Sequence, residues 1–257
     1  MPPSLAEVGR RGRLDLTFGC RAGTTILSEA YCEVPFKITR LQDSGLAGIA
    51  HLILMQATAG LFGGDTVEMS IHVESGARVL VTQQSATKAH PSAGRLAVQT
   101  HAIRVDPGGE LRLHLEPLIP FASARVEQRM SIDLAEDATL SYWEGLMAGR
   151  VARGETWAFA SLNAETRLVV DGRLRFLDRY ALEPKDRPVN GVWAMAEARY
   201  VGTGLRYGKD AEDLADRLHT VLPEAGAAVP EPGLLAVRVV ARDGVAFHRA
   251  RAAFCEM

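Results

Sequence analysis

Side chains able to bind a metal ion or activate a nucleophile are scattered along this chain. The seven histidines stand at positions 51, 72, 90, 101, 114, 219 and 248, with no pair at the spacing of metal ligands on a helix or a β-ribbon. The three cysteines, Cys20, Cys32 and Cys255, form no CxxC pair. HExxH, GxSxG and GxxxxGK[ST] motifs are missing as well. We therefore expect no catalytic set, no nucleotide site and no tightly bound cofactor.

Three short clusters remain as candidates for a site. Gly60–Asp65 is glycine-rich, and its Asp65 could equally bond the backbone of a tight turn. Thr82–Lys88 is a polar run that leaves a hydrophobic strand, as either a solvated loop or a binding rim. In the third cluster, Trp143–Glu155, Glu144 directly follows a tryptophan. Partial burial there would shift the pKa of its carboxyl group. An ordinary ion-paired loop is the alternative for this third cluster.

The elements that must position these clusters are strands. Apolar and polar residues alternate from Val67 to Val73, a Ser75-Gly76 turn follows, and Val79 and Val81 continue the pattern. The strand–turn–strand pattern recurs, with second strands that begin near Ala77, Glu110, Ala138 and Arg173. We expect a mainly β fold whose elongated body is built from stacked β-hairpins or β-sheets over residues 14–182. His72 and His114 fall on the polar phase of their strands, so we expect both to face solvent.

Helices are predicted only near the C-terminus. Asp210 can cap a helix with Leu214 and Leu218 on one face, and Asp243 can cap another that carries Phe247. A buried strand is expected between them over 234–240. No linker or low-complexity segment divides the chain, so we expect one domain over 1–257, with about two helices within 210–257.

Composition excludes several classes of protein. The 257 residues are 47% hydrophobic and 23% charged, which is typical of a globular fold. A formal net charge of −2 provides no basic field for nucleic acid or for an anionic membrane. Ser44–Gly64 has no charged residue, but its five glycines favour a buried strand and a turn over a membrane span. An odd cysteine count and no evident signal peptide predict a cytoplasmic protein.

Several motifs, taken together and in order, resemble the urease accessory protein UreD (UreH) family over about residues 13–240. Gly149–Glu155 resembles the family's GRxAxGE segment, and Asp178–Leu182 resembles its DRxxL segment. The preceding matches are Gly63-Gly64-Asp65, Gly76-Ala77, Thr82-Gln83 and Ala86-Thr87-Lys88. The chain departs from the family pattern at Ala89–Ser92 and at its Cys255-Glu256-Met257 end.

The resemblance implies a non-catalytic scaffold and chaperone. It would bind apo-urease and, through UreF, the GTPase UreG, and would assist GTP-dependent nickel delivery to urease. The missing phosphate loop agrees with a role in which a partner hydrolyses the nucleotide. Scattered carboxylates and water would hold transient nickel(II) weakly, as delivery requires, whereas several imidazoles or thiolates would release it slowly.

We hypothesise that Asp65, Glu144 and Asp178 line a wet internal passage for nickel. Glu155 and His114 are lesser candidates for the same path. The alternative is that these acids bond turn backbones. The candidates for a partner-binding rim are Thr82, Gln83, Lys88, Arg150 and Arg153.

A second class of function is a carbohydrate-active enzyme or binding module on a β scaffold. Glu144 and Asp178 could then be the paired carboxylates of a glycosidase, which needs them about 5–9 Å apart. Aromatic residues make up only 6% of the chain, and Trp143, Trp157 and Trp193 are dispersed, which disfavours a sugar-binding face.

Overall fold

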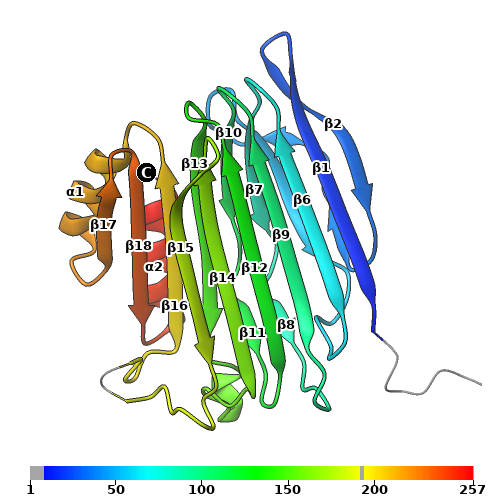
Figure 1. Cartoon of the computed structure of the whole chain (residues 1–257), viewed down its shortest axis with the longest axis vertical. Helices are drawn as coiled ribbons and strands as arrows, with labels where there is room; N and C mark the ends of the chain where they lie inside the picture. The colour runs from blue at the N-terminus through cyan, green and yellow to red at the C-terminus, as the bar shows by residue number, and fades with distance from the viewer. Residues whose placement is uncertain (1–8, 192–193, 257) are drawn as a thin grey trace, which may run out of the picture.

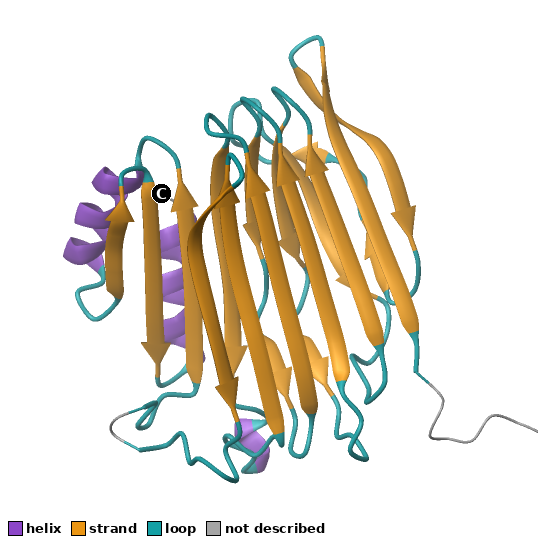
Figure 2. Cartoon of the chain, in the orientation of Figure 1, coloured by secondary structure: helices purple, strands orange, loops and turns teal. Residues whose placement is uncertain are grey.

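Two β-sheets pack face to face, and two helices cover the outer face of the second sheet (Figures 1 and 2). This computed structural model describes residues 9–191 and 194–256. Trp193, which the sequence analysis counts among the dispersed tryptophans, lies outside the described residues. The mainly β fold with two helices near the C-terminus is confirmed.

The first sheet, sheet A, has seven strands in the order β15-β14-β12-β9-β6-β1-β2. Strands β1, β6, β9, β12 and β14 run parallel, while β2 and β15 close the two edges antiparallel. The strands are β1 (Arg11–Arg21), β2 (Thr24–Cys32), β6 (Thr66–Val73), β9 (Ala97–Val105), β12 (Arg125–Leu134), β14 (Ser161–Val170) and β15 (Arg173–Leu182).

The second sheet, sheet B, has eleven strands, and its main path runs β17-β18-β16-β13-β10-β7-β5-β3. Here β5, β7, β10 and β13 are the parallel neighbours. The strands are β3 (Phe36–Ile38), β4 (Gln42–Asp43), β5 (Ala50–Gln56), β7 (Arg78–Gln83), β8 (Thr87–Ala89), β10 (Glu110–His114), β11 (Leu118–Pro120), β13 (Thr139–Met147), β16 (Tyr200–Tyr207), β17 (Gly226–Glu231) and β18 (Leu234–Ala241).

The repeated strand–turn–strand units are arches rather than the expected hairpins. In the β6–β7, β9–β10 and β12–β13 units, the tight turn carries the chain from sheet A to sheet B, and each strand bonds to its counterpart in the next unit. Only the last unit, β14–β15, is a hairpin. Apolar and polar residues alternate along a strand in an arch as well as in a hairpin. The alternation therefore does not show which neighbouring strand pairs with the backbone N–H and C=O groups.

The helices α1 (Ala211–Val221) and α2 (Gly244–Cys255) form a second core with the outer face of sheet B. Asp243 caps α2 as predicted, since its Oδ1 accepts a bond from the Ala246 N–H at 2.9 Å. Asp210 precedes α1 but does not cap it, because its carboxylate binds the guanidinium of Arg206.

Glycines in β16 let α2 approach sheet B closely. A Cβ at Gly202 would lie 3.2 Å from the Phe247 ring of α2, and one at Gly204 would lie 2.9 Å from the Phe254 ring. Aromatic side chains therefore fill the space that ordinary strand residues would occupy.

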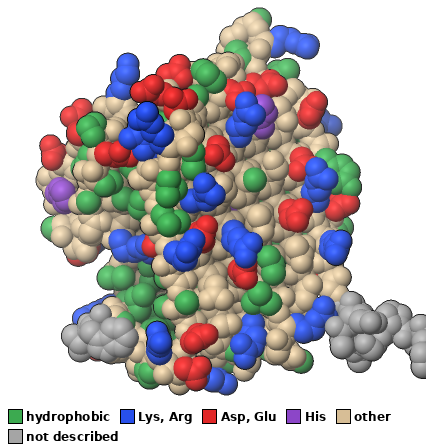
Figure 3. All heavy atoms as spheres, viewed as in Figure 1, with side chains coloured by type: hydrophobic (Ala, Val, Ile, Leu, Met, Phe, Trp, Pro, Cys, Tyr) green, Lys and Arg blue, Asp and Glu red, His purple; other side chains and the backbone are tan. Residues whose placement is uncertain are grey.

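The outer face of sheet A is polar and mixed in charge. Figure 3 shows basic and acidic side chains interspersed across this face. Several are paired, including Arg179 with Glu165 and Arg104 with Asp106. None of the helices in the described ranges is both long enough and apolar enough to cross a membrane. The uncharged stretch Ser44–Gly64 instead contains strand β5.

Candidate functional site

The space between the two sheets changes character along the strands. We call the end of the sandwich with the tight turns at 74–77, 106–109 and 135–138 the turn end, and the opposite end the loop end; in Figure 1 the arrowheads of β6, β9 and β12 point to the turn end. Near the turn end the inward side chains are aliphatic, as Ile103 and Val105 are on β9. His101 and Gln99 lie on the same face of β9, two and four residues before Ile103, and both are buried and polar.

The loop half of this inter-sheet layer contains two adjoining cavities. The larger one offers about 40 Å³ to water-sized molecules and the smaller one about 10 Å³. Leu118, Gln128, Glu144 and Gly145 line both, so the hollow region continues from one to the other. These volumes accommodate a few water molecules.

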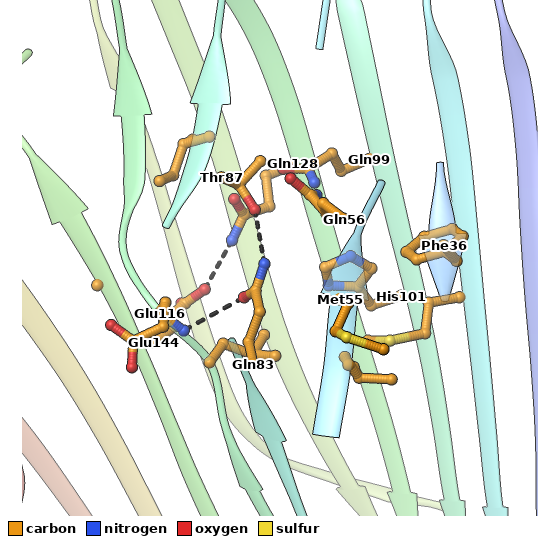
Figure 4. Close-up of a pocket in the computed structure, with 15 residues that line it drawn as sticks. Phe36, Met55, Gln56, Gln83, Thr87, Gln99, His101, Glu116, Gln128 and Glu144 are labelled. Carbon is orange, nitrogen blue, oxygen red and sulfur yellow. Dashed lines mark hydrogen bonds between the residues drawn. The ribbon is translucent and has the colours of Figure 1, made fainter. Parts of the chain in front are cut away.

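The two cavities cross the strands rather than follow them. Phe36 of β3 and Gln56 of β5 border the larger cavity, whereas Tyr180 of β15 and Val201 of β16 border the smaller one. Figure 4 shows the larger cavity, with Glu144 and Gln83 at one side and Phe36 at the other.

Glu144 occupies the shared part of the two cavities. It lies on the inward face of β13 in phase with Leu140 and Leu146 and is only 9% exposed. Gln128 Nε2 donates a hydrogen bond to Glu144 Oε2 at 2.7 Å, and Thr166 Oγ1 donates one to Oε1 at 3.1 Å. Burial raises the pKa of the Glu144 carboxyl group above its ordinary value, and the hydrogen bond from Thr166 offsets only part of that effect. The site thus holds one carboxylate in a poorly solvated, hydrogen-bonded position.

Asp178 lies in the same layer, one strand beyond Thr166. The two residues are register partners on β15 and β14. Arg238 of β18 reaches across from sheet B and forms an ion pair with the Asp178 carboxylate. The negative charge of Asp178 raises the pKa of Glu144 further, while Arg238 lowers it. The fold therefore places Asp178 close enough to affect Glu144 electrostatically, although Asp178 itself lines neither cavity.

Asp65 does not line either cavity. Its carboxylate accepts bonds from the Arg10 N–H at 2.8 Å and the Phe62 N–H at 2.9 Å. It is 6% exposed and closes the Gly60–Asp65 turn. This is the turn-backbone arrangement that the sequence analysis gave as the alternative.

His114 is buried, and the expectation that it faces solvent was wrong. It lies on the outer face of sheet B, beneath α2, and is 5% exposed. Its Nε2 and Ser141 Oγ are 3.0 Å apart, and burial lowers the pKa of the imidazole to about 3. Period two distinguishes the faces of a strand, but a helix from the far end of the chain covers this one. His72 is partly buried and bonds the Asp106 carboxylate at 2.8 Å.

Glu155 and Arg150 form an ion pair in the loop at the loop end. Arg150 Nε donates to Glu155 Oε2 at 2.9 Å, and the Ala122 N–H donates to the same oxygen at 3.1 Å. Arg150 lowers the pKa of Glu155 below its ordinary value, and Glu155 raises the pKa of Arg150. Arg153 is exposed in the short 3₁₀ helix Val151–Arg153. This is the ion-paired loop that the sequence analysis kept open.

An aromatic stack connects that loop to the Gly60–Asp65 turn. The rings of Phe62 and His90 are stacked with centroids 4.3 Å apart, and His90 meets the edge of Phe121 at 5.0 Å. The Arg150 guanidinium lies 4.2 Å from the centroid of Phe121. His90, where the sequence departs from the family pattern, thus connects two of the three candidate clusters.

The Thr82–Lys88 cluster divides between the two faces of sheet B. Gln83 points into the larger cavity, where its Nε2 donates to Thr87 Oγ1 at 2.9 Å and its Oε1 accepts from the Glu116 N–H at 3.2 Å (Figure 4). Thr82 faces the other side and bonds His51 at 2.8 Å. Lys88 is exposed on β8.

The polar partners in the cavity were missed by the sequence analysis. Gln128 and Thr166 bond Glu144 directly, and Gln99 and His101 line the larger cavity. The signal was a polar residue at the apolar phase of an alternating strand, which is uncommon enough to mark a site. Within residues 9–191 and 194–256, no three His, Cys, Asp or Glu side chains gather as a ready metal site.

Comparison with known proteins identifies the family. The sequence model described as UreD urease accessory protein matches residues 10–257. The chain belongs to the UreD family. It is 31% identical to the urease accessory protein UreD of Ralstonia nicotianae, over 94% of this chain and 86% of that protein. It is 32% identical to the UreD of Anaeromyxobacter sp., over 97% of this chain and 88% of that protein.

The UreD motifs therefore have identifiable structural places. The Gly63-Gly64-Asp65 turn and the Gly149–Glu155 loop both lie at the loop end, next to the aromatic stack. Asp178 of the DRxxL-like segment faces the inter-sheet layer near Glu144. The segment over which the sequence analysis placed the UreD resemblance, 13–240, falls inside the matched range.

Proposed function

We propose that this UreD-family chain acts in urease maturation as a non-catalytic scaffold and chaperone. In this role it binds apo-urease and, through UreF, the GTPase UreG, in the cytoplasm. Nickel(II) is its cargo, which it helps to deliver to the urease active site in a GTP-dependent step. The polar hollow around Glu144, which crosses the inter-sheet layer, is the observation that carries this proposal.

The chemistry of the hollow favours transit over storage. Glu144 supplies one carboxylate, and the amides of Gln83, Gln99 and Gln128 supply neutral oxygens. A divalent cation surrounded by one carboxylate, amides and water binds weakly and leaves quickly. Burial raises the pKa of Glu144, and a cation beside the carboxyl group would favour its ionised form.

In this proposal the other candidate residues have different roles. Asp178 adjoins Glu144 and is held by Arg238, so we place it at the exit side of the path. Asp65 and Glu155 are bound to backbone N–H groups and to Arg150, respectively, so we assign them to the loop-end architecture. His114 lies on the far face of sheet B, so we leave it off the path.

The loop end is our proposed side for partners. Lys88 and Arg153 are exposed there, and Phe62 presents an apolar ring that is 43% exposed. Arg150 supports this surface through its stack on Phe121. Thr82 and Gln83, by contrast, bond within the chain.

The test is Glu144→Gln in cells that express urease with its accessory proteins. Glutamine keeps the size of the side chain and removes its charge. We expect the nickel content of urease to fall at least about 10-fold while complexes with partner proteins form normally. Glu127→Gln is the matched control, since Glu127 is on β12, next to Gln128, but pairs with Arg129 on the outer face. Full nickel loading by Glu144→Gln would contradict the passage.

A carbohydrate-active enzyme or binding module, the second class considered, has less support. Ligand pockets for small molecules are typically about 300–1,000 Å³. The cavities at Glu144 offer about 40 and 10 Å³. Asp178 is also engaged by Arg238. No observation favours a sugar at this site.

A further inference from the structure

The charges on the outer face of sheet A follow the strand order. One row of outward side chains crosses five neighbouring strands in register, namely Arg13 (β1), Glu68 (β6), Thr100 (β9), Arg129 (β12) and Glu165 (β14). Arg13, Glu68 and Arg129 are exposed, and the other two are half-buried. Along the row the charges are positive, negative, neutral, positive and negative. The two halves of the row are therefore opposite in sign about β9.

The next row toward the turn end has the same property. It consists of Asp15, Ser70, Ala102, Ser131 and Arg167, taken from the same five strands. A serine lies on each side of Ala102, and the two ends carry opposite charges. The small side chains in the middle leave this part of the face low, so that another surface can come close to it.

Apolar side chains continue this row to the edges of the sheet. Tyr31 of β2 is the register partner of Asp15, and Leu177 of β15 is the register partner of Arg167. Tyr31 is 50% exposed and Leu177 is 47% exposed. Both lie three strands from β9, on opposite sides of it. The apolar positions are thus also symmetric about β9.

A surface that is opposite in sign about a central line is complementary to a second copy of itself. If the copy is turned over about an axis that runs along β9, its β12 lies over β6 and its β14 lies over β1. Glu68 then faces the partner's Arg129, and Arg13 faces the partner's Glu165. Two-fold symmetry makes each of these contacts occur twice, as in any isologous interface.

The other two-fold axis in the plane of the sheet fails this test. An axis along the row, perpendicular to the strands, would place every strand over its own copy. Glu68 would then face the partner's Glu68, and Arg129 would face the partner's Arg129. Like charges in direct opposition disfavour that arrangement.

One residue near the β9 axis meets its own copy with the same charge. Arg104 is the central residue of the third row, between His72 and Asp133. Its Nε lies 2.9 Å from Asp106 Oδ1, so its charge is compensated within the chain. On either side of it, His72 faces the partner's Asp133, which is a favourable pair.

The face has the area that a stable dimer needs. Both α-helices pack on sheet B, so within residues 9–191 and 194–256 no α-helix covers this face. Seven strands spaced about 4.8 Å apart, with a length of about 30 Å, give roughly 900 Å² on each copy, or about 1,800 Å² in total. Specific protein interfaces typically bury about 1,200–2,000 Å² in total.

We propose that the outer face of sheet A binds the same face of a second copy of this chain, about a two-fold axis along β9. Sheets packed face to face keep their strands within about 30° of each other, so the pairs closest to the axis keep their register best. Glu68 with the partner's Arg129 is the innermost charged pair. Because the axis follows the strands, both loop ends of the dimer point the same way.

Sedimentation velocity of the full chain tests self-association. We expect a monomer–dimer equilibrium whose dissociation constant rises about 10-fold when the salt concentration is raised from about 0.05 M to about 0.5 M, because salt screens exposed charges. A chain that remains monomeric up to about 0.1 mM would overturn the proposal and leave this face to a different protein.

Charge reversal tests which surface is used. Glu68→Arg and Arg129→Glu each replace two attractive contacts in the dimer by two repulsive ones, so each should weaken dimerisation about 10-fold or more. The matched control is Arg249→Glu on α2, where Arg249 is 68% exposed and pairs with Glu224. It should leave the dissociation constant unchanged. An equal loss in this control would show that net charge, rather than this face, drives association.

Mixing the two charge-reversal variants tests the symmetry. In a heterodimer, the introduced arginine of one chain faces the introduced glutamate of the other, and the unchanged Arg129 faces the unchanged Glu68. An equimolar mixture should therefore dimerise about as well as the wild-type chain, although each variant alone does not. A mixture that stays as weak as the separate variants overturns the proposed axis.

Cross-linking locates the axis independently of charge. In a background with alanine at Cys20, Cys32 and Cys255, Thr100→Cys places one thiol of each copy beside the axis. A short bismaleimide should link these two thiols. Thr17→Cys, on the same face of β1, is the matched control, since two strands separate it from β9 and its two copies would lie about 19 Å apart. Equal cross-linking of both variants, or of Thr17→Cys alone, would contradict an axis along β9.

Discussion

The two halves of the inter-sheet layer are built from the same strands but differ in what they hold. At the turn end, Val105, Leu111 and Leu140 pack with almost no exposure and no polar partner among them. At the loop end, the same strands β9 and β13 present His101 and Glu144 to a hollow space. The first half has the composition of an ordinary core, and the second has that of a site.

The difference shows how parallel stacking builds a site. In each arch the sheet A strand runs toward the turn and the sheet B strand runs away from it. A polar residue early in the sheet A strand and one late in the sheet B strand therefore both lie near the loop end. Because the arches stack in register, Gln99 and Gln128 become direct neighbours. Repeating one pattern along the chain places its polar positions together.

The largest predicted effect is a difference in stability loss between the tightly packed turn half and the hollow loop half. Leu111→Ala at the turn end should lower the free energy of unfolding by about 2–5 kcal/mol, because it leaves an empty cavity in a tight aliphatic layer. Leu115→Ala should cost less, since its lost volume joins an existing cavity that is large enough for water. Urea unfolding of both variants measures the contrast. Equal losses would show that the loop half is as tightly packed as the turn half.

The second prediction concerns acid. The pKa of His101 falls from its ordinary 6.5 to about 4 in the fold, so the unfolded chain binds a proton that the folded chain refuses. Its contribution to stability is present above pH 6.5 and is lost as pH falls toward 4, by about 2 kcal/mol at pH 5. His101→Leu should remove this part of the pH slope. Urea unfolding at pH 7 and pH 5 measures it; an unaltered slope would mean that the imidazole is protonated in the fold.

The third prediction has the opposite sign. The pKa of Glu144 is raised in the fold, so the ionised carboxylate destabilises the folded state as pH rises through that value. Glu144→Gln should therefore stabilise the protein by about 1 kcal/mol at pH 8 and by nothing at pH 4. Thermal unfolding at the two pH values checks this. A variant less stable than wild type at pH 8 would show that the carboxylate is fully compensated by Gln128 and Thr166.

The smallest effect is expected at the edge of the layer. Asp178→Asn breaks a pair with Arg238 whose side chains are 22% and 39% exposed. Partly exposed pairs contribute about 0–1 kcal/mol, so the free energy of unfolding should change by less than about 1 kcal/mol. Chemical denaturation measures this change. A larger loss of unfolding free energy would show that the Asp178–Arg238 pair behaves as a buried ion pair.

The sequence predicted much of the fold because the fold follows local patterns. Alternation located β6, β9, β10 and β13, and the Asp243 cap located α2. Glu144 was a candidate because it adjoined Trp143, although the two side chains point to opposite faces of β13. Gln99, His101 and Gln128 were missed, since each looks ordinary until its strand neighbours are known.

The sequence by itself determined the family, the strand periodicity, the position of both helices and the short supply of ready metal ligands. These follow from residue types and local spacing, which the chain carries before it folds. Only the tertiary structure decided that the turns link two sheets, that α2 buries His114 and that Glu144 meets Thr166 across strands. Those facts depend on which distant segments satisfy each other's backbone groups and cover each other's faces, and a spacing along one chain does not contain that information.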